Sequence, residues 1–409
     1  MENTTETNSL SLTSCQEHAK VEIETWLVDP DRPEFILSGG AGVGKSTLLD
    51  LILKDIDQVN DMCELLAVDQ RLHDVLFTAT TNKAASVIEG ETIYTLLGIS
   101  IYNDYKTGEV KYNLKNAQPR YNSLIIVDEA SMVDPKILKK IRELCSGCKI
   151  LYVGDRNQLH PVGYSFSPVF DSGVEMVHMT TQCRQDAHSH LYSVICDIQK
   201  WVETGVPCTL RAGPGVTYID DIGLVDFIDN PSFSDKMVCY TNAACMKLNE
   251  FVRFKRGLST DFFTEGESVM SNTTTVPKGK YTKRVLTDAQ YTISSIGPET
   301  SHFNLFKYRH VYLDGIPADV PVDPVQYNGI LKSLKAKKDW RTYFTLKERF
   351  VEIRDAYAIT THKSQGSTYD RVLINLSNFK RCTDKVMLAR LLYVAISRAR
   401  TEVLLYGSL

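Results

Sequence analysis

The chain has 409 residues, of which 43% are hydrophobic and 23% are charged, and its formal net charge is −4. This length predicts about two to four domains, and the composition is typical of a globular protein. The charge excludes a globally positive surface, so any nucleic-acid site must be a local groove. No apolar run approaches the ~20 residues that span a bilayer, so we expect no membrane association.

The ten cysteines are spread along the chain without a repeated spacing, as expected for free thiols in a reducing compartment. Cys145 and Cys148 form a CxxC, but no further ligand at zinc-site spacing lies nearby. We therefore interpret this CxxC as a turn between a helix and a strand at 149–153. Residues 1–11 are polar and lack the apolar core of a signal peptide, so we expect a frayed tail and a cytoplasmic protein.

The first helix is predicted from an apolar pattern over residues 21–27. Thr13 is its candidate N-cap, and Gln16 three residues later would complete a capping box. The amide of Gln16 has a second candidate role, which is a hydrogen bond to the edge of an adenine base. The residues alone leave both roles open.

A glycine-rich segment at 39–46 reads GGAGVGKS and has the spacing G-x-x-x-x-G-K-[ST]. An apolar run at 35–37 precedes it and another at 47–53 follows, which predicts a strand, a loop and a helix. Glycines let the backbone wrap closely around an anion, and the start of the helix adds its positive end. The segment therefore predicts phosphate binding.

The candidate nucleotide contacts in this segment are Gly42, Gly44, Lys45, Ser46 and Thr47. Lys45 would reach the β- and γ-phosphates, and Ser46 would place its hydroxyl on Mg²⁺. A plain glycine turn is the alternative. The complete motif, set between a strand and a helix, argues against it.

A second strand is predicted at 74–78, and small polar residues follow it. Thr80 and Asn82 lie where a helix begins, a position that can hold a phosphate of a polymer chain. Ordinary capping of the helix by Thr80 or Thr81 is the alternative.

Residues 99–114 have the pattern of a β-hairpin, with Tyr102, Tyr105, Val110 and Tyr112 flanking a turn. Such a hairpin can be an inert insertion or a wedge on which a base stacks. Both interpretations remain open from the residues.

Two adjacent carboxylates end the apolar run 124–127, which suits a parallel strand buried on both faces. Asp128 would hold Mg²⁺ through its water shell, and Glu129 would polarise the attacking water. With the phosphate loop, this pair predicts hydrolysis as well as binding.

A further apolar run at 150–153 ends in a polar turn that contains Gln158, which could contact the γ-phosphate or its water. Arg184 follows another short strand. It could form a surface ion pair or supply charge to the transferring phosphoryl group.

A second set of alternating elements begins near residue 190, with a strand at 236–240. Thr241 and Asn242 start the next helix and echo the earlier arrangement at Thr80. We therefore predict a duplicated architecture.

Residues 272–350 break this alternation. Strand patterns at 291–296 and 303–313, with proline turns, predict a small β-barrel, and a basic helix is predicted at about 325–338. For the basic run at 332–349, a solvated helix face is at least as good an interpretation as a nucleic-acid contact.

The strand–helix pattern resumes at 358–368 and includes a buried run at 372–374. A helix at 391–400 is predicted to carry Arg398 and Arg400 at its end. A final strand is predicted at 402–406.

Read together, the segments GGAGVGKST, TTNKAA, VDEAS, GDRNQLHPV, CRQ, THKSQGST and YVAISRAR resemble the superfamily 1B helicases. In layout they are most similar to the Dda-like helicases of phages and the RecD group. The resemblance runs from Leu12 to the C-terminus, and it is weakest over 99–123 and 272–350.

The resemblance implies an α/β fold of two RecA-like P-loop motor domains, with a β-hairpin insertion in the first and an SH3-like barrel insertion in the second. The implied boundaries are 1–98 and 124–188 for the first motor domain, 99–123 for the hairpin, 189–271 and 351–409 for the second motor domain, and 272–350 for the barrel with its basic helix.

The resemblance also implies that ATP binds in the cleft between the motor domains. Gln16 would contact adenine, Gln158 and Arg184 would sense the γ-phosphate, and Arg398 would be an arginine finger from the second domain. Gln365 and Gly366 would join the nucleotide site.

The single-stranded DNA path would be lined by Thr80, Asn82, Thr92, Tyr94, His160, Pro161, Thr241, Asn242, Thr361, His362 and Ser364. Tyr94 and His160 depart from the residues common in the family at those places. His362 has an alternative role, which is to orient the loop that carries Gln365.

The implied function is an ATP- and Mg²⁺-dependent DNA helicase that moves 5′ to 3′ on single-stranded and fork DNA. We expect a monomer that works with single-strand-binding or replisome proteins, in the host cytoplasm if a phage encodes it. The alternatives are a protein-displacing translocase with weak unwinding and a nucleotide-gated DNA-binding recruitment protein. The Asp128–Glu129 pair argues against the last.

Overall fold

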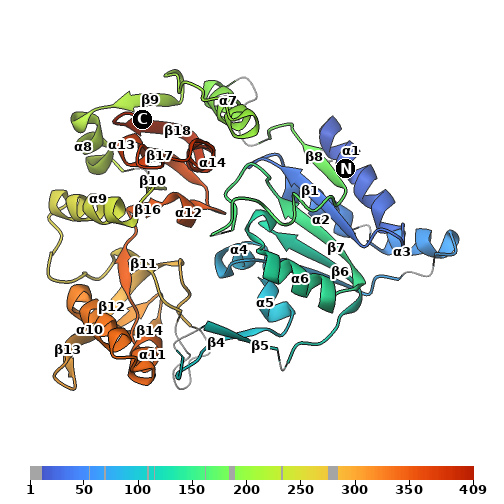
Figure 1. Ribbon diagram of the computed structural model, residues 1–409. Coiled ribbons are helices and arrows are strands. Elements are labelled where there is room, and N and C mark those ends of the chain that lie inside the picture. Colours follow the sequence, from blue (N-terminus) through green and yellow to red (C-terminus); the bar gives the residue numbers. More distant parts are fainter. Residues whose placement is uncertain are drawn as a thin grey trace, which may run out of the picture.

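The computed structural model describes residues 12–54, 56–68, 71–107, 110–114, 116–161, 163–183, 189–231, 234–274 and 284–409. Figure 1 shows two α/β lobes side by side and a smaller β domain beneath the second lobe. The tail expected at residues 1–11 lies outside the described residues. Among the helices that are described, none is long and apolar enough to cross a lipid bilayer.

A six-stranded parallel sheet forms the centre of the first lobe, with strand order β3-β2-β6-β7-β1-β8. Its central strands are apolar along their length because helices cover both faces. The bounds are β1 (Glu34–Gly39), β2 (Asp74–Ala79), β3 (Glu91–Thr92), β6 (Tyr121–Asp128), β7 (Gly147–Gly154) and β8 (Met176–Met179).

Helices pack on both faces of this sheet and bury two apolar clusters. One face carries α1 (Ser14–Leu27), α2 (Lys45–Lys54) and α3 (Ile56–Leu65), and the other carries α5 (Ile93–Leu96) and α6 (Pro135–Leu144). Two short helices follow strand ends, namely α4 (Asn82–Val87) after β2 and the 3₁₀ helix η1 (Ala130–Met132) after β6.

Two local predictions in this lobe are confirmed. Thr13 caps α1, and the Gln16 side chain accepts the Thr13 N–H at 2.9 Å, which completes the capping box. Cys145 and Cys148 flank the turn between α6 and β7, and both thiols are buried.

The second lobe repeats the layout, as predicted, on a five-stranded parallel sheet of order β16-β10-β17-β18-β9. Its strands are β9 (Val216–Ile219), β10 (Asp235–Cys239), β16 (Ala358–Thr360), β17 (Tyr369–Asn375) and β18 (Ala399–Tyr406). One face is covered by α7 (His190–Thr204), α13 (Leu376–Phe379) and α14 (Lys385–Ile396), and the other by α8 (Asp221–Asp229) and α9 (Asn242–Lys255). The short helix α12 (Thr361–Ser364) follows β16.

The end of α14 differs from the prediction of a helix over 391–400. The helix stops at Ile396, and Ala399 already pairs with Tyr369 of β17. Parallel pairing with a buried strand therefore overrides the helical pattern, and Arg398 lies in the tight turn between helix and strand.

The insertion in the second lobe is a five-stranded antiparallel sheet of order β14-β13-β12-β11-β15. An isolated bridge joins Asp319 in one edge strand to Phe350, which precedes the strand at the other edge. The bounds are β11 (Ser268–Ser271), β12 (Gln290–His302), β13 (Phe306–Leu313), β14 (Ile316–Pro321) and β15 (Ile353–Asp355). Because β11 and β15 belong to this sheet, it extends beyond the expected limits of 272–350.

Two further differences concern this insertion. The strand predicted at 303–313 begins at Phe306, because Phe303 and Asn304 have positive φ and form the turn after a longer β12. The basic helix predicted at about 325–338 is confirmed as α10 (Pro324–Ala336), and a second helix that was not predicted, α11 (Trp340–Arg349), follows it. All the basic side chains of the run 332–349 are exposed, which agrees with a solvated face.

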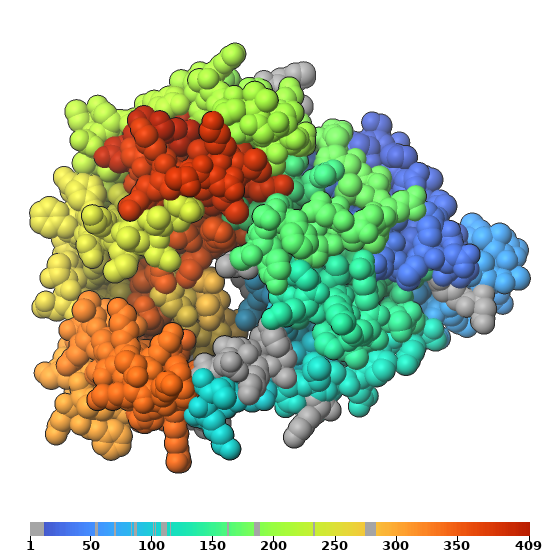
Figure 2. Space-filling view, viewed as in Figure 1, coloured from blue at the N-terminus to red at the C-terminus, as the bar shows by residue number. Residues whose placement is uncertain are grey.

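The predicted hairpin is confirmed and consists of β4 (Ser100–Asn103) and β5 (Val110–Asn113). Gly108 and Glu109 of its turn lie outside the described residues. Before them, the Tyr105 hydroxyl donates to Glu348 Oε2 at 2.8 Å, and its ring lies 5.4 Å from that of Phe344. Glu348 and Phe344 belong to α11, so the hairpin of the first lobe contacts the insertion of the second (Figure 2).

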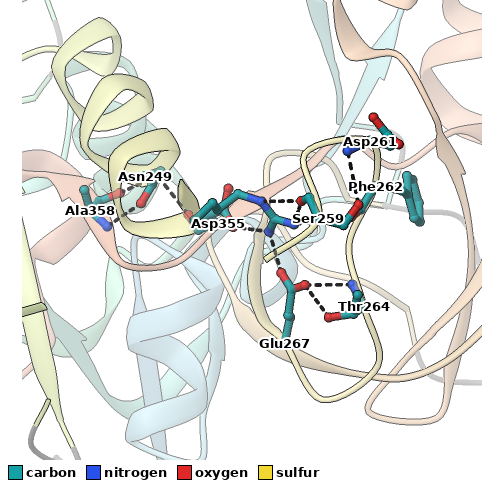
Figure 3. A network of polar contacts seen from close by, with 9 residues as sticks. Asn249, Ser259, Asp261, Phe262, Thr264, Glu267, Asp355 and Ala358 are labelled. Carbon is teal, nitrogen blue, oxygen red and sulfur yellow. Dashed lines mark hydrogen bonds and ion pairs between the residues drawn. The ribbon is translucent and has the colours of Figure 1, made fainter. Parts of the chain in front are cut away.

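Arg253 on α9 anchors the insertion to the second lobe (Figure 3). Its guanidinium contacts Glu267 at 2.5 Å and Asp355 at 2.8 Å, and it donates to the Ser259 carbonyl. One turn earlier, the Asn249 amide donates to the Asp355 carbonyl. One face of α9 therefore holds both chain connections between lobe and insertion.

Candidate functional site

The phosphate loop joins β1 to α2 and has the backbone that its glycines predict. Gly42 and Gly44 have φ values of +88° and +82°, which L residues with a side chain rarely adopt. A Cβ on Gly39 would lie 2.8 Å from Val43 Cγ2, and one on Gly44 would lie 2.3 Å from Gln16 Nε2. The loop is therefore tightly packed and admits no larger residue at these positions.

Lys45 opens α2, and its ammonium group turns back into the loop. It donates to the carbonyls of Gly39 and Gly40 at 2.7 and 3.0 Å. Burial lowers the pKa of Lys45, while Asp155, Glu129 and Asp128 oppose the shift. Ser46 and Thr47 follow in the first turn, and Ser46 is exposed.

Asp128 and Glu129 end β6 beside this lysine. Asp128 Oδ1 accepts the Glu129 N–H at 2.8 Å, and burial raises the pKa of Asp128. Glu129 has φ +50°, a left-handed conformation that is strained for glutamate and is often found at functional sites.

Burial, and then the charge of Asp128, raise the pKa of Glu129 to about 7, while Arg398 and Lys45 oppose the shift. Its Oε2 is buried and has no hydrogen-bond partner within the described part of the chain. A carboxylate with this pKa could accept a proton from water near neutral pH.

Arg398 reaches this group of charges from the second lobe. Its guanidinium is 3% exposed and donates to the carbonyls of Val394 and Ser367 at 3.0 and 3.3 Å. Its charge lowers the pKa of both Glu129 and Lys45, so it acts across the seam between the lobes.

The turn after β7 makes further contacts across the seam. Tyr393 donates its hydroxyl to Asp155 Oδ2 at 2.8 Å, and Arg390 donates to the Gln158 carbonyl at 2.6 Å. Gln365 donates its amide to Gln158 Oε1 at 3.4 Å. Asp155 and Tyr393 were not among the predicted site residues, although both lie within the quoted motifs.

Gln16 lies against the outer side of the loop, where its Nε2 donates to the Val43 carbonyl at 3.2 Å. Its Oε1 is used by the capping box. Arg184, predicted to sense the γ-phosphate, lies outside the described residues.

A cavity of about 930 Å³ lies between the lobes, the hairpin and the insertion. Five of the predicted DNA contacts line it together with the nucleotide-site residues Glu129, Gln365 and Gly366. These five are Thr80, Asn82, Thr92, Tyr94 and His362. Helix α4 is capped by Thr81, so the Thr80 hydroxyl is not needed as a cap. It is buried without a partner in the described chain and lies at the cavity wall.

Thr361 and Ser364, also predicted as DNA contacts, do not line this cavity. Both are fully buried, and Ser364 Oγ donates to the Thr361 carbonyl at 2.7 Å. They stabilise the turn of α12 that presents His362. Thr241 caps α9 and bonds to Asn378, and Asn242 Oδ1 accepts from Arg354 at 3.3 Å.

His160 and Pro161 also lie apart from the cavity lining. Burial, and then the neighbouring Arg390, lower the pKa of His160. Conversely, Arg284 and Lys363 line the cavity but were not among the predicted DNA contacts, although Arg284 ends a basic run at 278–284 and Lys363 lies in the segment THKSQGST. Lys363 forms an ion pair with Asp288 of the insertion at 2.5 Å. The position of Arg284 depends on how the insertion folds, whereas Lys363 belongs to α12 of the second lobe.

Fold and site together define a P-loop protein of two RecA-like α/β lobes, with charged groups from both lobes at one seam. Residues 28–164 match the AAA domain family, and residues 355–406 match the UvrD-like helicase C-terminal domain.

Several relatives with similar sequences are named as helicases. The ATP-dependent DNA helicase dda of Enterobacteria phage T4 is 23% identical over 426 residues, which cover 90% of this chain and 93% of that protein. The ATP-dependent DNA helicase PIF1 of Emericella nidulans is 31% identical over 143 residues, or 31% of this chain and 18% of that protein.

The fold matches a solved structure along nearly its whole length. The crystal structure of Bacteroides Pif1 bound to ssDNA has a TM-score of 0.55 at 18% identity and covers 97% of this chain and 92% of that one. The two matched family models, the dda relative and this fold together support a superfamily 1B helicase.

Proposed function

We propose that the protein is an ATP-dependent DNA helicase that moves 5′ to 3′ along single-stranded DNA and separates duplex at its hairpin. The observation that carries the proposal is the seam. Lys45 and Glu129 come from one lobe and Arg398 from the other, and the charge of Arg398 lowers the pKa of both. Hydrolysis then requires both lobes together, so chemistry is coupled to lobe movement.

In this proposal Gln16 contacts the adenine base, Lys45 binds the β- and γ-phosphates, and Glu129 accepts a proton from the attacking water. Gln158 positions that water, and Arg398 stabilises the charge that develops on the transferring phosphoryl group. Each residue acts by position and charge, which suits a reaction whose catalysis is mainly electrostatic.

The residues present also fit a magnesium ion. Ser46 and Asp128 offer a hydroxyl and a carboxylate, which are hard oxygen ligands, and no larger cage of His, Cys, Asp or Glu is found among the described residues. This donor set suits Mg²⁺, which keeps several waters and binds through few side chains plus substrate phosphates. When bound, the ion would neutralise phosphate charge.

The cavity between the lobes supports single-stranded DNA as the polymer that is moved. Hydroxyl and amide side chains make up just over half of its lining residues, and the charged lining residues are Arg284, Lys363, Glu129 and Asp288. Such a wall suits contacts to phosphates with little sequence preference. Glu129 also borders this cavity, so a strand lying in it would be close to the catalytic carboxylate.

Duplex separation is assigned to the hairpin because its turn is held in place. Tyr105 contacts α11 through a hydrogen bond and an aromatic contact, which should keep the hairpin from bending away under load. Opening one base-pair step costs on the order of 1.4 kcal/mol of stacking, a small load for one nucleotide-driven step.

The test is unwinding of partial duplexes that carry a single-stranded tail at the 5′ end only or at the 3′ end only, under single-turnover conditions with ATP and Mg²⁺. We expect unwinding of the duplex with the 5′ tail only. Unwinding of the duplex with the 3′ tail would reject the assigned direction. A variant with residues 104–109 replaced by two glycines should keep DNA-stimulated ATPase but lose unwinding. Retained unwinding would reject the role of the hairpin.

A further inference from the structure

The segment 181–183 lies along the outer edge of the phosphate loop. The Cys183 N–H donates to the Gly42 carbonyl at 2.9 Å, and the Cys183 thiol donates to the Val43 carbonyl at 3.9 Å. Gln16 Nε2 lies 3.7 Å from the same sulfur. Cys183 therefore touches both the loop and the amide assigned to the base.

A second cysteine meets the first at Thr181. Cys15 Sγ accepts the Thr181 N–H at 3.4 Å, and the Cys183 thiol donates to the Thr181 carbonyl at 3.7 Å. Both sulfurs thus contact the peptide groups of one residue. Cys15 also directly precedes Gln16 in the first turn of α1.

These two thiols can be reached from solution, unlike most of the others. Cys183 is exposed and Cys15 is half-buried, whereas six other cysteines are fully buried. Burial raises the pKa of Cys15, but hydrogen bonds involving Thr13 and Thr181 outweigh this effect, so the pKa lies below its usual value. Burial, and then the neighbouring Cys15, raise the pKa of Cys183. Cys15 is therefore the better thiolate of the pair.

We propose that Cys15 and Cys183 form a reversible redox site, and that a disulfide between them closes the base-binding side of the nucleotide pocket. The inference rests on the proposed function, because it assigns Gln16 to the adenine base. Disulfides in a reducing compartment are usually transient and redox-sensing, which suits this role.

The oxidant is a peroxide. The Cys15 thiolate attacks one oxygen of hydrogen peroxide, which breaks the O–O bond, forms a sulfenic acid and releases the other oxygen as water after protonation. The Cys183 thiol then attacks the sulfenic sulfur, which forms the S–S bond and releases a second water. Two thiols lose two electrons and the peroxide gains them, and an excess of a small thiol reverses the bond.

The bond would move the Gln16 amide. An S–S bond is about 2.05 Å long, so forming it would draw the Cys183 sulfur toward Cys15 and away from its contacts with Gln16 and Val43. The amide has no room on the loop side, because a Cβ on Gly44 would already lie 2.3 Å from it. The residues assigned to hydrolysis are not touched, so nucleotide affinity should fall more than turnover.

The experiment treats the full chain with hydrogen peroxide, removes excess oxidant and measures DNA-stimulated ATPase before and after dithiothreitol. We expect a roughly tenfold higher KM for ATP, as for the loss of one or two hydrogen bonds, with full recovery on reduction. Mass spectrometry without reduction should find a peptide pair that joins Cys15 to Cys183, and bound ADP with Mg²⁺ should slow its formation.

Cys15→Ser and Cys183→Ser should each abolish the oxidant effect relative to their own reduced activity. Cys208→Ser is the matched control and should remain sensitive, because Cys208 is half-buried in the second lobe. The absence of the linked peptide, or equal sensitivity of Cys183→Ser, overturns the inference alone. A reduced protein without DNA-stimulated ATPase would instead overturn the proposed function, and the mass measurement would still test the bond.

Discussion

The Tyr393 hydroxyl donates to Asp155 Oδ2 at 2.8 Å, and this hydrogen bond joins the two lobes beside the phosphate loop. Both side chains are at most 2% exposed. The same hydroxyl lies 3.0 Å from the position that a Cβ on Gly40 would occupy. A single buried contact therefore links the second lobe, the turn after β7 and the loop.

Replacing Tyr393 with Phe removes only that hydroxyl. A hydrogen bond to a charged group contributes about 1.5–3 kcal/mol, so the closed arrangement should be less populated and kcat for ATP should fall about tenfold or more. The measurement is DNA-stimulated ATPase. Tyr406→Phe is the matched control, since its hydroxyl donates to exposed Asp221 within the second lobe at 2.6 Å. An equal loss in both variants would contradict a special role for the seam.

Lys45→Ala should abolish ATP hydrolysis while the fold persists. The ammonium group is the phosphate-loop cation, and removing a preorganised charge of this kind costs about 10²–10³ in rate. Phosphate release with single-stranded DNA measures the loss, and circular dichroism checks the fold. Full activity in this variant would reject the nucleotide site.

Arg398→Ala should lose hydrolysis far more than ATP binding, by about 10³ or more if it acts as an arginine finger. Arg400→Ala is the matched control, because Arg400 is exposed and pairs with Asp370 at 3.4 Å. Single-turnover hydrolysis and filter binding of ATP separate the two effects. If ATP binding and hydrolysis fell together in Arg398→Ala, the residue would be structural.

Glu129→Gln should be more stable than the parent protein at pH 8, although it is catalytically impaired. Burial and Asp128 raise the folded-state pKa of Glu129 to about 7, above its unfolded value. The folded protein therefore binds an extra proton, and the stability from the protonated carboxyl is lost as pH rises through 7. Gln resembles that protonated form. The free energy of unfolding of Glu129→Gln should therefore exceed that of the parent by on the order of 1–3 kcal/mol at pH 8 and by little at pH 4.

Urea unfolding of both proteins at the two pH values gives this comparison. A stability difference independent of pH would show that Glu129 does not titrate as described. In parallel, kcat/KM of the parent should fall as pH drops below about 7, because the base is then protonated.

Arg253→Gln should weaken the anchor of the insertion. The substitution leaves the buried carboxylates Glu267 and Asp355 without their cation. Breaking a buried ion pair in this way typically lowers the free energy of unfolding by about 3–5 kcal/mol. Lys307→Ala removes an exposed pair with Glu299 and should lower the free energy of unfolding far less. Urea unfolding compares the two, and similar losses would contradict the anchoring role.

Much of the fold could be predicted because its signals are local. The phosphate loop, the capping box at Thr13 and Gln16, and the buried strands each have a pattern within a few residues. The end of α14 could not be predicted in this way, since the apolar run continues to Ile396 and only pairing of Ala399 with β17 stops the helix.

The candidate site was less predictable where it depends on contacts between distant segments. The hydroxyl of Thr361 matched a family motif, yet it is fully buried and donates to the Cys239 carbonyl. The bond between Tyr393 and Asp155 joins residues 238 positions apart. Such pairs follow from how two rigid lobes meet, which local periodicity does not encode.

The contact between Tyr105 and α11 completes a closed circuit of protein. One side is the seam at Tyr393 and Asp155, and the opposite side is the hairpin turn resting on the insertion. A polymer occupying the central cavity would therefore be surrounded by protein on all sides. A DNA strand with a free end could enter the cavity end first. A covalently closed circle of DNA could enter only after the contact between Tyr105 and α11 had broken.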